Sequence, residues 1–433
     1  MSGIIKTLLD NDLYKYTMQQ AVLCKFPDTP VEYEFKCRNK EPVNLFPYEK
    51  EIREEIDKLC ELKFKQDELN YLKSLRYIKP SYVNFLRYFK LNPENVILYK
   101  KDDYLKGYKL GINIKGNWLD TILFEVPVLA IVSEIYCKNI SKHNLEWTNG
   151  PTNPPSFIGN NHFDKKVKLL NEYNERTAYD LKFTDFGTRR RFSYDWQEHI
   201  ISRCLKELPQ NFVGTSNVHF AKEFKTTPIG TMAHEWIMAG QGMEEHTSVK
   251  YSQRYMLQKW ADVYRGDLGT ALSDTLGFDA FLNDFDMYFA KLFDSCRHDS
   301  GDPYVWGNKL INHYLGYKID PKTKTGIFSD GLDFQKMIDI HRCFSGVSLE
   351  STNISFSSIN IDANRKIKVS FGIGTNLDND CGVKPIQIVI KMTRCNGRPV
   401  AKISDSAGKQ MCEDKEYLRY LASRFNIPKE RVE

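Results

Sequence analysis

The chain has 433 residues, of which 41% are hydrophobic and 27% charged, a composition that fits a globular protein and excludes a mostly disordered or collagen-like chain. Its 61 basic and 56 acidic residues leave a formal net charge of +5, too balanced to indicate a general nucleic-acid-binding surface. With about 150 residues per domain as a guide, one to three compact units are expected.

Membrane and secretory classes are also disfavoured. The longest apolar run, residues 126–132, is far shorter than the ~20 residues that span a bilayer. The first ten residues contain one lysine and no long apolar region, so we expect no secretory signal. The ten cysteines lie scattered between Cys24 and Cys412 and indicate reduced thiols. We therefore expect a cytoplasmic enzyme with no membrane and no nucleic-acid partner.

Helix and strand patterns alternate over the first part of the chain. The spacing of apolar residues predicts a helix over residues 8–24, and alternation predicts a strand over residues 31–37. Residues 48–86 are charged, aromatic-rich and helical in pattern, whereas residues 96–110 have the pattern of a hairpin.

Two segments with prolines interrupt these patterns. The apolar segment over residues 119–132 is predicted to break at Pro127. Residues 147–161 are rich in Asn, Pro and Gly, which predicts a loop or a family-specific insertion.

From residue 181 onward, short strand-like runs each end in small or polar residues, and most precede a helical stretch. The runs cover residues 181–186, 211–213, 227–229, 268–272, 294–297, 326–328 and 367–371. Strands that end in this way are typical of a parallel α/β barrel whose chemistry lies at one rim. An open doubly wound sheet makes the same local pattern, and we favour the barrel over it.

One strand end has the composition of an anion-binding loop. Gly372-Ile373-Gly374-Thr375 follows an alternating strand, and its glycines would let backbone N–H groups approach an anion while Thr375 adds a hydroxyl donor. The third glycine and the amphipathic helix of the dinucleotide-binding fingerprint are missing. A plain turn is the alternative interpretation.

His234 lies just inside a predicted helix start. A helix N-terminus favours an anion, so a phosphate carried on or near His234 would be stabilised there. The zinc-protease motif fails because its second histidine position is Met238. A purely structural histidine is the alternative.

Two charged clusters also follow strand-like runs. Arg189-Arg190-Arg191 could place at least one guanidinium on a phosphate or carboxylate, the alternative being a solvated edge. The segment from Arg297 to Asp302 contains a cation and two carboxylates, Asp299 and Asp302, which would suit an anionic substrate and a Mg²⁺-bound diphosphate. A tight Asp/Gly turn is the alternative for this segment.

Taken together, these clusters resemble the nicotinate phosphoribosyltransferases, in order, from residue 10 to about residue 380. The resemblance rests on Asp12-Leu13-Tyr14-Lys15, Asp185-Phe186-Gly187-Thr188-Arg189, Gly214-Thr215-Ser216-Asn217, Gly230-Thr231-Met232-Ala233-His234-Glu235, Arg297 with Asp299-Ser300-Gly301-Asp302, Ser329-Asp330-Gly331 and Gly372-Ile373-Gly374-Thr375. Each motif is weak alone, but seven in order are specific. The departures, around residues 151–161 and in the tail after Cys395, touch no motif.

The resemblance implies a fold and a reaction. The α/β fold would be that of the type II phosphoribosyltransferases, an irregular parallel α/β barrel packed beside an N-terminal α+β domain. The expected division is residues 1–136, 137–385 and 386–433, the last segment packing back on the N-terminal domain. Nicotinate and 5-phosphoribosyl diphosphate (PRPP) would give nicotinate mononucleotide and diphosphate in NAD biosynthesis. ATP is the expected co-substrate and Mg²⁺ the expected cofactor, in a homodimer with shared active sites.

The resemblance also assigns roles to individual residues. His234 matches the histidine that ATP phosphorylates, and the tyrosine matching Tyr14 stacks on the ring from the neighbouring subunit. The positions expected to contact nicotinate are Tyr14, Phe186, Ser216, Thr231 and Arg297. The positions expected to bind PRPP or phosphate are Arg189, Asp299, Asp330, Gly331, Gly374 and Thr375, with Asp299 and Asp330 also holding Mg²⁺ through the diphosphate.

The nearest alternative is a nicotinamide phosphoribosyltransferase of the same fold. In that branch the position matching Ser216 is an Asp, which accepts from an amide but would repel a carboxylate. Ser216 can donate a hydrogen bond and so favours nicotinate. A quinolinate enzyme is disfavoured by the ATP-linked histidine motif, and type I phosphoribosyltransferases are disfavoured because their paired-acid segment is not visible.

Two alternatives come from other functional classes. A catalytically inactive binding or regulatory protein of this fold would need a broken site, whereas every motif position here carries a competent residue. A nucleic-acid module around the three arginines 189–191 would bind DNA or RNA with steep salt dependence.

Overall fold

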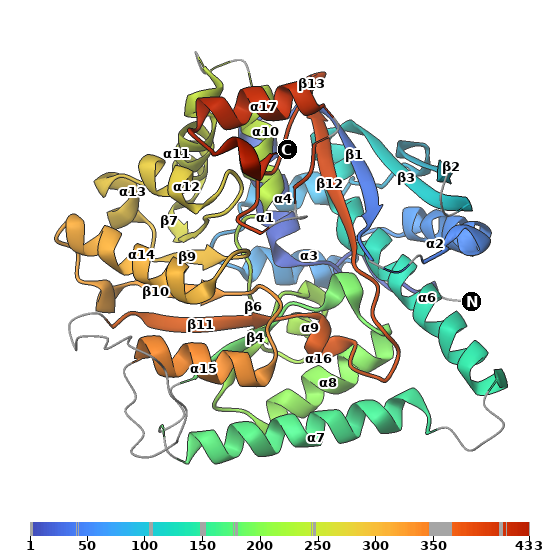
Figure 1. Cartoon of the computed structure of the whole chain (residues 1–433). Helices are drawn as coiled ribbons and strands as arrows, with labels where there is room; N and C mark the ends of the chain where they lie inside the picture. Colours follow the sequence, from blue (N-terminus) through green and yellow to red (C-terminus); the bar gives the residue numbers. More distant parts are fainter. Residues whose placement is uncertain are drawn as a thin grey trace.

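The computed structural model of the chain describes residues 3–432 apart from residues 40, 42, 104–106, 148–152, 176, 178–180, 244, 246–247, 346–365, 407–409 and 413. A five-stranded antiparallel sheet and a seven-stranded parallel sheet organise it. Figure 1 shows the antiparallel strands at the upper right and the parallel strands at the lower left. The buried apolar side chains of both parts form one main core.

Helix α1 (Leu13–Lys25) is enclosed by the rest of the protein. It begins at Leu13, later than the sequence pattern predicts, and its residues from Leu13 to Val22 are all buried. Buried polar side chains need partners, because a lone polar group in an apolar environment is costly. Lys15, Gln19 and Gln20 of this helix therefore form hydrogen bonds or ion pairs inside the protein.

The region predicted to be helical over residues 48–86 forms α2 (Glu49–Glu61), α3 (Gln66–Ser74) and α4 (Pro80–Leu86). Short helix α5 (Trp118–Thr121) then precedes the long helix α6 (Glu125–Trp147). The predicted break at Pro127 is wrong. Pro127 lies in the first turn of α6, where a missing backbone N–H removes no helical hydrogen bond.

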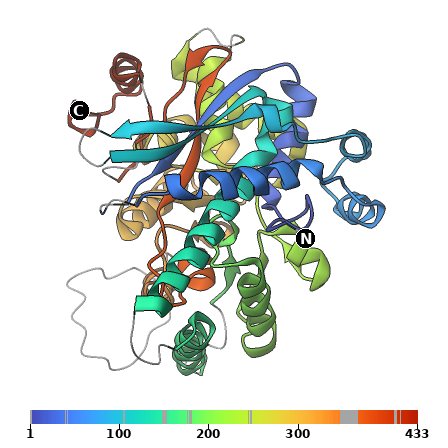
Figure 2. The same ribbon diagram turned by 90° about the vertical axis from the view of Figure 1, so that its right-hand side faces the viewer.

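Helix α7 (Pro155–Asn174) corrects a second prediction. It begins inside the Asn/Pro-rich segment 147–161, with Pro155 in its first turn, a position that suits proline. The predicted loop is therefore wrong from Pro155 onward, while residues 148–152 lie outside the described residues. Figures 1 and 2 show α6 running from the antiparallel sheet towards α7.

The antiparallel sheet combines both ends of the chain. Its strand order is β13 (Arg398–Pro399), β12 (Ile388–Cys395), β1 (Pro30–Cys37), β3 (Gly107–Asn117) and β2 (Val96–Asp103). Strands β2 and β3 form the predicted hairpin, and β12 pairs with β1 from Cys37↔Ile388 to Val31↔Cys395. The segment after residue 386 thus returns to the N-terminal sheet. The predicted division at residue 136 falls within α6, and the three-part division remains a prediction.

The parallel sheet contains a strand in each of the seven predicted runs. In sheet order these are β6 (Thr227–Pro228), β5 (Phe212–Thr215), β4 (Phe183–Asp185), β11 (Lys368–Ile373), β10 (Thr325–Phe328), β9 (Ser295–His298) and β8 (Thr270–Leu272). The edge strands β6 and β8 approach each other at Thr231, whose Oγ1 donates to the carbonyl oxygen of Thr270 at 3.0 Å. A curled parallel sheet beside an antiparallel sheet confirms the predicted fold class.

Further helices pack around the two sheets. They are α8 (Tyr194–Glu207), α9 (Val218–Glu223), α10 (His234–Ala239), α11 (Ser252–Tyr264), α12 (Phe278–Asp284), α13 (Met287–Leu292), α14 (Pro303–Gly316), α15 (Phe334–Ser345), α16 (Thr375–Asp378) and α17 (Lys415–Arg424). Several start at a side-chain cap, for example Ser193, Asn217 and Asp302, which accept from backbone N–H groups of the first turn. Among the described residues, no helix is both long and apolar enough to cross a membrane.

Candidate active site

The candidate site lies at the carboxyl ends of the parallel strands. Strand β4 ends at Asp185, β9 at His298 and β11 at Ile373, and the residues that follow belong to the predicted site. The register aligns these ends, since Asp185 pairs with Ile373 and Arg297 pairs with Leu272. In parallel α/β barrels this is the rim that carries the chemistry.

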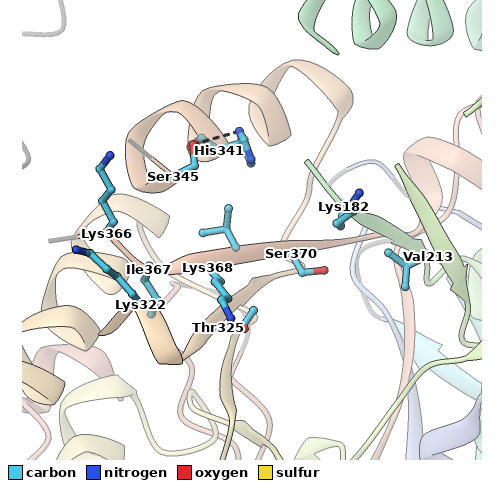
Figure 3. A pocket seen from close by; sticks show the side chains of 11 residues that line it. Lys182, Val213, Lys322, Thr325, His341, Ser345, Lys366, Ile367, Lys368 and Ser370 are labelled. Atoms are coloured by element: carbon cyan, nitrogen blue, oxygen red, sulfur yellow. Dashed lines mark hydrogen bonds between the residues drawn. The ribbon is translucent and has the colours of Figure 1, made fainter. Parts of the chain in front are cut away.

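A cavity of about 550 Å³ lies at the opposite rim. Figure 3 shows Lys182, Thr325 and Lys368 among its lining residues. Lys182 precedes β4, while Thr325 and Lys368 are the first residues of β10 and β11. The cavity is therefore at the amino ends of the strands and is separate from the candidate active site.

His234 is buried among three charged groups. Its Nε2 lies 2.9 Å from Asp274 Oδ1, 2.7 Å from Lys402 Nζ and 3.6 Å from Asp299 Oδ2. Lys402 Nζ also lies 3.0 Å from Asp274 Oδ2, which in addition accepts a 2.6 Å hydrogen bond from Ser300. The imidazole is thus held in place from two strand ends and from the C-terminal segment.

This surrounding keeps the imidazole neutral and its partner acid ionised. Burial, together with the adjacent Lys402 ammonium, lowers the pKa of His234 to about 4. Burial opposes ionisation of Asp274, but Lys402 and His234 hold the pKa of Asp274 well below its usual range. A neutral imidazole has one unprotonated nitrogen, whose lone pair can act as a nucleophile.

Arg297, Asp299 and Phe186 form a second group at the rim. Arg297 Nη2 donates to Asp299 Oδ1 at 3.0 Å, and Arg297 Nε donates to Ser329 Oγ at 2.8 Å. The Arg297 guanidinium carbon lies 5.5 Å from the centre of the Phe186 ring. A cation close to an aromatic ring suits a planar, anionic substrate. Through Asp299, this group is continuous with His234.

Two glycines make room for the Phe186 ring and its turn. A Cβ on Gly372 would lie 2.2 Å from Phe186 Cδ2, and a Cβ on Gly374 would lie 3.0 Å from the Phe186 carbonyl oxygen. The Phe186 N–H donates to the carbonyl oxygen of Ile373 at 2.7 Å. The predicted phosphate loop therefore lies beside the predicted ring-stacking residue. Thr375 begins helix α16 directly after it.

Arg189 and Tyr14 lie close to each other on the same chain. Arg189 Nη1 is 3.7 Å from Glu125 Oε1, and the Tyr14 hydroxyl is buried with no hydrogen-bond partner among the described residues. Burial raises the pKa of Tyr14 well above its usual value, and the charges of Glu125 and Arg189 act on it in opposite directions. Tyr14 is thus a neutral, buried phenol beside a guanidinium.

Ser216 and Thr231 hold the N-terminal segment against the barrel. Ser216 Oγ donates to Asp12 Oδ1 at 2.8 Å, and the carbonyl oxygen of Thr231 accepts from Thr17 at 2.6 Å. Burial raises the pKa of Asp12, despite the opposing charge of Arg189. The Ser216 hydroxyl is therefore already engaged by a side chain of its own protein, which the sequence did not reveal.

Asp330 and Gly331 lie just after the end of β10, and the charge of Asp330 opposes the lowering of the His298 pKa that burial causes at the end of β9. Gly331 has a φ of 58° in the left-handed region that favours glycine. The His234, Asp274 and Asp299 ligand atoms lie within 4.8 Å of one another. Because the Lys402 ammonium contacts both His234 and Asp274, positive charge is supplied there by a side chain, and the triad is not favoured as a metal site.

The structure therefore brings five of the twelve predicted site residues into one group and adds others. His234, Asp299, Arg297 and Phe186 form one connected group, and Gly374 adjoins Phe186. Sequence reasoning missed Asp274, Lys402 and Glu125, and it gave no role to Ser329 although Ser329 lies in a quoted motif. Asp274 does follow a strand-like run, in Ser273-Asp274, so its position gave a signal. Lys402 gave none, because it lies in the tail outside every motif.

The fold and the site define an α/β-barrel enzyme built to bind anionic substrates around a buried histidine. Family models agree with this class. The model of the nicotinate phosphoribosyltransferase (NAPRTase) family matches residues 181–429, and the model of the NAPRTase N-terminal domain matches residues 9–133.

Full-length relatives give the same result. A nicotinate phosphoribosyltransferase of Burkholderia mallei is 48% identical over 98% of this chain and 97% of its own length, and one of Xylella fastidiosa is 46% identical over 99% of both. The crystal structure of nicotinate phosphoribosyltransferase from Vibrio cholerae superimposes with a TM-score of 0.84 at 38% identity, covering 99% of this chain and 96% of that one. The chain belongs to the nicotinate phosphoribosyltransferase family.

Proposed function

We propose that this enzyme forms nicotinate mononucleotide and diphosphate from nicotinate and PRPP, coupled to ATP hydrolysis through phosphorylation of His234. The observation that carries the proposal is the continuous group from Phe186 through Arg297 and Asp299 to His234, in a chain of this family. It combines a surface for an aromatic anion with a neutral, buried imidazole.

The transfer step requires little covalent work from the protein. The pyridine nitrogen of nicotinate forms a bond to the ribose carbon while the bond from that carbon to diphosphate breaks, and diphosphate leaves with the electron pair. Catalysis is then positioning and electrostatic stabilisation. Phe186 would stack on the ring, Arg297 would neutralise the carboxylate, and Arg189 with the Gly374-Thr375 turn would bind phosphate.

His234 would accept the γ-phosphoryl group of ATP, with ADP as the leaving group, and water would later release inorganic phosphate. Nδ1 forms no hydrogen bond within the described part of the chain, whereas Nε2 faces Asp274 and Lys402. We therefore assign Nδ1 as the attacking nitrogen. Asp274 would orient the ring, and the Lys402 ammonium would offset the negative charge that phosphorylation adds.

Mg²⁺ would enter with the diphosphate of PRPP. Mg²⁺ is commonly held by one or two carboxylates together with substrate phosphates and water. Asp299 and Asp330 are both half-buried at the rim and fit this description. The two carboxylates would hold Mg²⁺ through the diphosphate, and Asp299 is in addition oriented by Arg297.

Two broader predictions belong with this function. A homodimer with shared active sites is proposed from the resemblance alone. Within a single chain Tyr14 already lies near Arg189, so the contacts of the single chain do not require a second subunit. A cytoplasmic location is proposed from cysteine usage, and no disulfide joins any of the ten cysteines, all of which lie in the described part of the chain.

A product assay tests the proposal. The enzyme is incubated with PRPP and Mg²⁺, with either nicotinate or nicotinamide, in the presence and absence of ATP, and the mononucleotides are separated by chromatography. We expect nicotinate mononucleotide, formed faster with ATP. Nicotinamide mononucleotide as the main product would replace the proposal with the related nicotinamide activity.

A further inference from the structure

Lys15 belongs to the first sequence motif, yet the proposed reaction gives it no role. Its side chain is fully buried in α1, and its Nζ lies 2.6 Å from Glu125 Oε2 and also pairs with Glu235 Oε2. Glu125 begins α6, and Glu235 lies in the first turn of α10. One ammonium group therefore joins three helices that are far apart in the sequence.

Glu235 directly follows His234, and both of its carboxylate oxygens are occupied. Oε2 is held by Lys15, while Oε1 accepts hydrogen bonds from the Tyr33 hydroxyl at 2.6 Å and from Trp118 Nε1 at 2.7 Å. These bonds attach the first turn of α10 to the antiparallel sheet. The position of the His234 backbone is fixed by the same bonds.

Glu125 connects the same lysine to the phosphate-binding side of the site. Its Oε2 is held by Lys15, and its Oε1 faces Arg189 Nη1 at 3.7 Å. The set of Lys15, Arg189, Glu125 and Glu235 contains two cations and two anions. Removing one buried member leaves an uncompensated charge, so the remaining members cannot keep their positions without a penalty.

We propose that Lys15 is a positioning residue that holds His234 and Arg189 in a fixed relative arrangement, and thereby couples the ATP step at His234 to phosphoribosyl transfer. The inference rests on the proposed function. Lys15 would act through Glu235 on one side and through Glu125 on the other. Its loss is expected to change how much ATP is consumed per product, beyond any change in stability.

The test compares Lys15→Gln with Lys324→Gln. Lys324 is also a buried lysine, but its Nζ donates to the carbonyl oxygens of Lys291 and Phe293 near the amino end of β10, remote from the site. Both variants should unfold at a lower temperature than the wild-type enzyme. Only Lys15→Gln should lower the ATP-stimulated rate, by about tenfold to a hundredfold as for a misplaced catalytic group, and raise the ATP consumed per mononucleotide. An unchanged ratio in folded Lys15→Gln would overturn the inference.

A double-mutant cycle covers the case in which Lys15→Gln does not fold. Glu125→Gln and Glu235→Gln each remove one charge while keeping the side-chain shape. The two single variants are compared with the variant that carries both substitutions. If Lys15 links the two acids, their effects on the ATP-stimulated rate should deviate from multiplicativity by about threefold or more. Multiplicative effects would refute the link. A wild-type enzyme that forms no nicotinate mononucleotide would instead refute the proposed function.

Discussion

At the residue scale, the charged groups of the candidate site gather around one ring nitrogen, Nε2 of His234. His234 Nε2 faces a carboxylate, an ammonium group and a second carboxylate within 3.6 Å. Since the ring is buried, water cannot take the place of these charged side chains, and a polar group left without a partner there would be costly. The reactivity of His234 therefore depends on residues that follow β8 and β9 and on the C-terminal segment.

Substitution of His234 gives the most direct prediction. His234→Ala should abolish phosphoenzyme formation and ATP stimulation but leave slow, ATP-independent transfer, because the nicotinate and PRPP contacts remain. The measurement is labelling with γ-³²P-ATP together with the product assay. An acid-labile phosphoenzyme in this variant would show that another residue is phosphorylated.

The pH dependence of phosphorylation follows from the environment of His234. Burial lowers the pKa of His234 to about 4, so the ring stays neutral throughout the range in which an ordinary histidine, with a pKa of about 6.5, becomes protonated. Phosphoenzyme formation should therefore stay nearly constant between about pH 7.5 and about pH 5.5. Rapid-quench labelling across this range checks it, and a steep fall near pH 6.5 would contradict a buried, neutral ring.

Ser216 offers a test of substrate choice. Ser216→Asp would place a second carboxyl group beside Asp12 and a like charge near a bound nicotinate, weakening nicotinate use relative to nicotinamide by about 1–3 kcal/mol if water is excluded. The measurement is kcat/KM for both substrates, with Ser216→Ala as the control that removes only the hydroxyl. Equal losses for both substrates would place Ser216 outside the recognition of the carboxylate.

At the scale of elements, the end of β11 and the turn after β4 pack so closely that a side chain added to the strand would displace the turn. A Cβ on Gly372 would meet the Phe186 ring at 2.2 Å, too close to be accommodated without moving the ring. The glycine is therefore required by a neighbouring strand end rather than by its own backbone conformation. This dependence ties the phosphate loop to the ring-stacking residue.

Gly372→Ala should thus displace Phe186 and raise the KM for nicotinate, with a loss in kcat/KM of about tenfold, the range expected when a positioning contact is disturbed. Gly316→Ala is the matched control, since no atom lies within 4 Å of the added methyl group at the end of α14. Steady-state kinetics of both variants check this. Equal kinetics would mean that the ring retains its position.

At the scale of the whole molecule, the prediction that remains is the shared active site of a homodimer. Tyr14→Ala and His234→Ala homodimers should both lack ATP-coupled activity. After subunit exchange between equal amounts, roughly a quarter of wild-type activity should return, because half the dimers are mixed and each contains one intact site. No recovery despite confirmed exchange would assign Tyr14 to its own chain, beside Arg189.

The sequence alone determined the fold class and the seven strand positions, while the roles of the site residues remain predictions. Parallel strands place their carboxyl ends at one rim, so residues such as Phe186, Arg297 and Gly374 could be grouped from local patterns alone. Two predictions at prolines, the break at Pro127 and the loop at Pro155, are wrong because proline both ends helices and occupies their first turn, and composition does not distinguish these cases.

Only the tertiary structure decided which charges meet. Lys402 reaches His234 because β12 returns to pair with β1, and Lys15 joins Glu125 and Glu235 because α1 is buried inside the protein. No spacing along the chain encodes these contacts, since they connect residues 110 to 220 positions apart, which only packing brings together. The charge state of the buried histidine follows from those contacts, because desolvation and neighbouring ions act through space and not along the sequence.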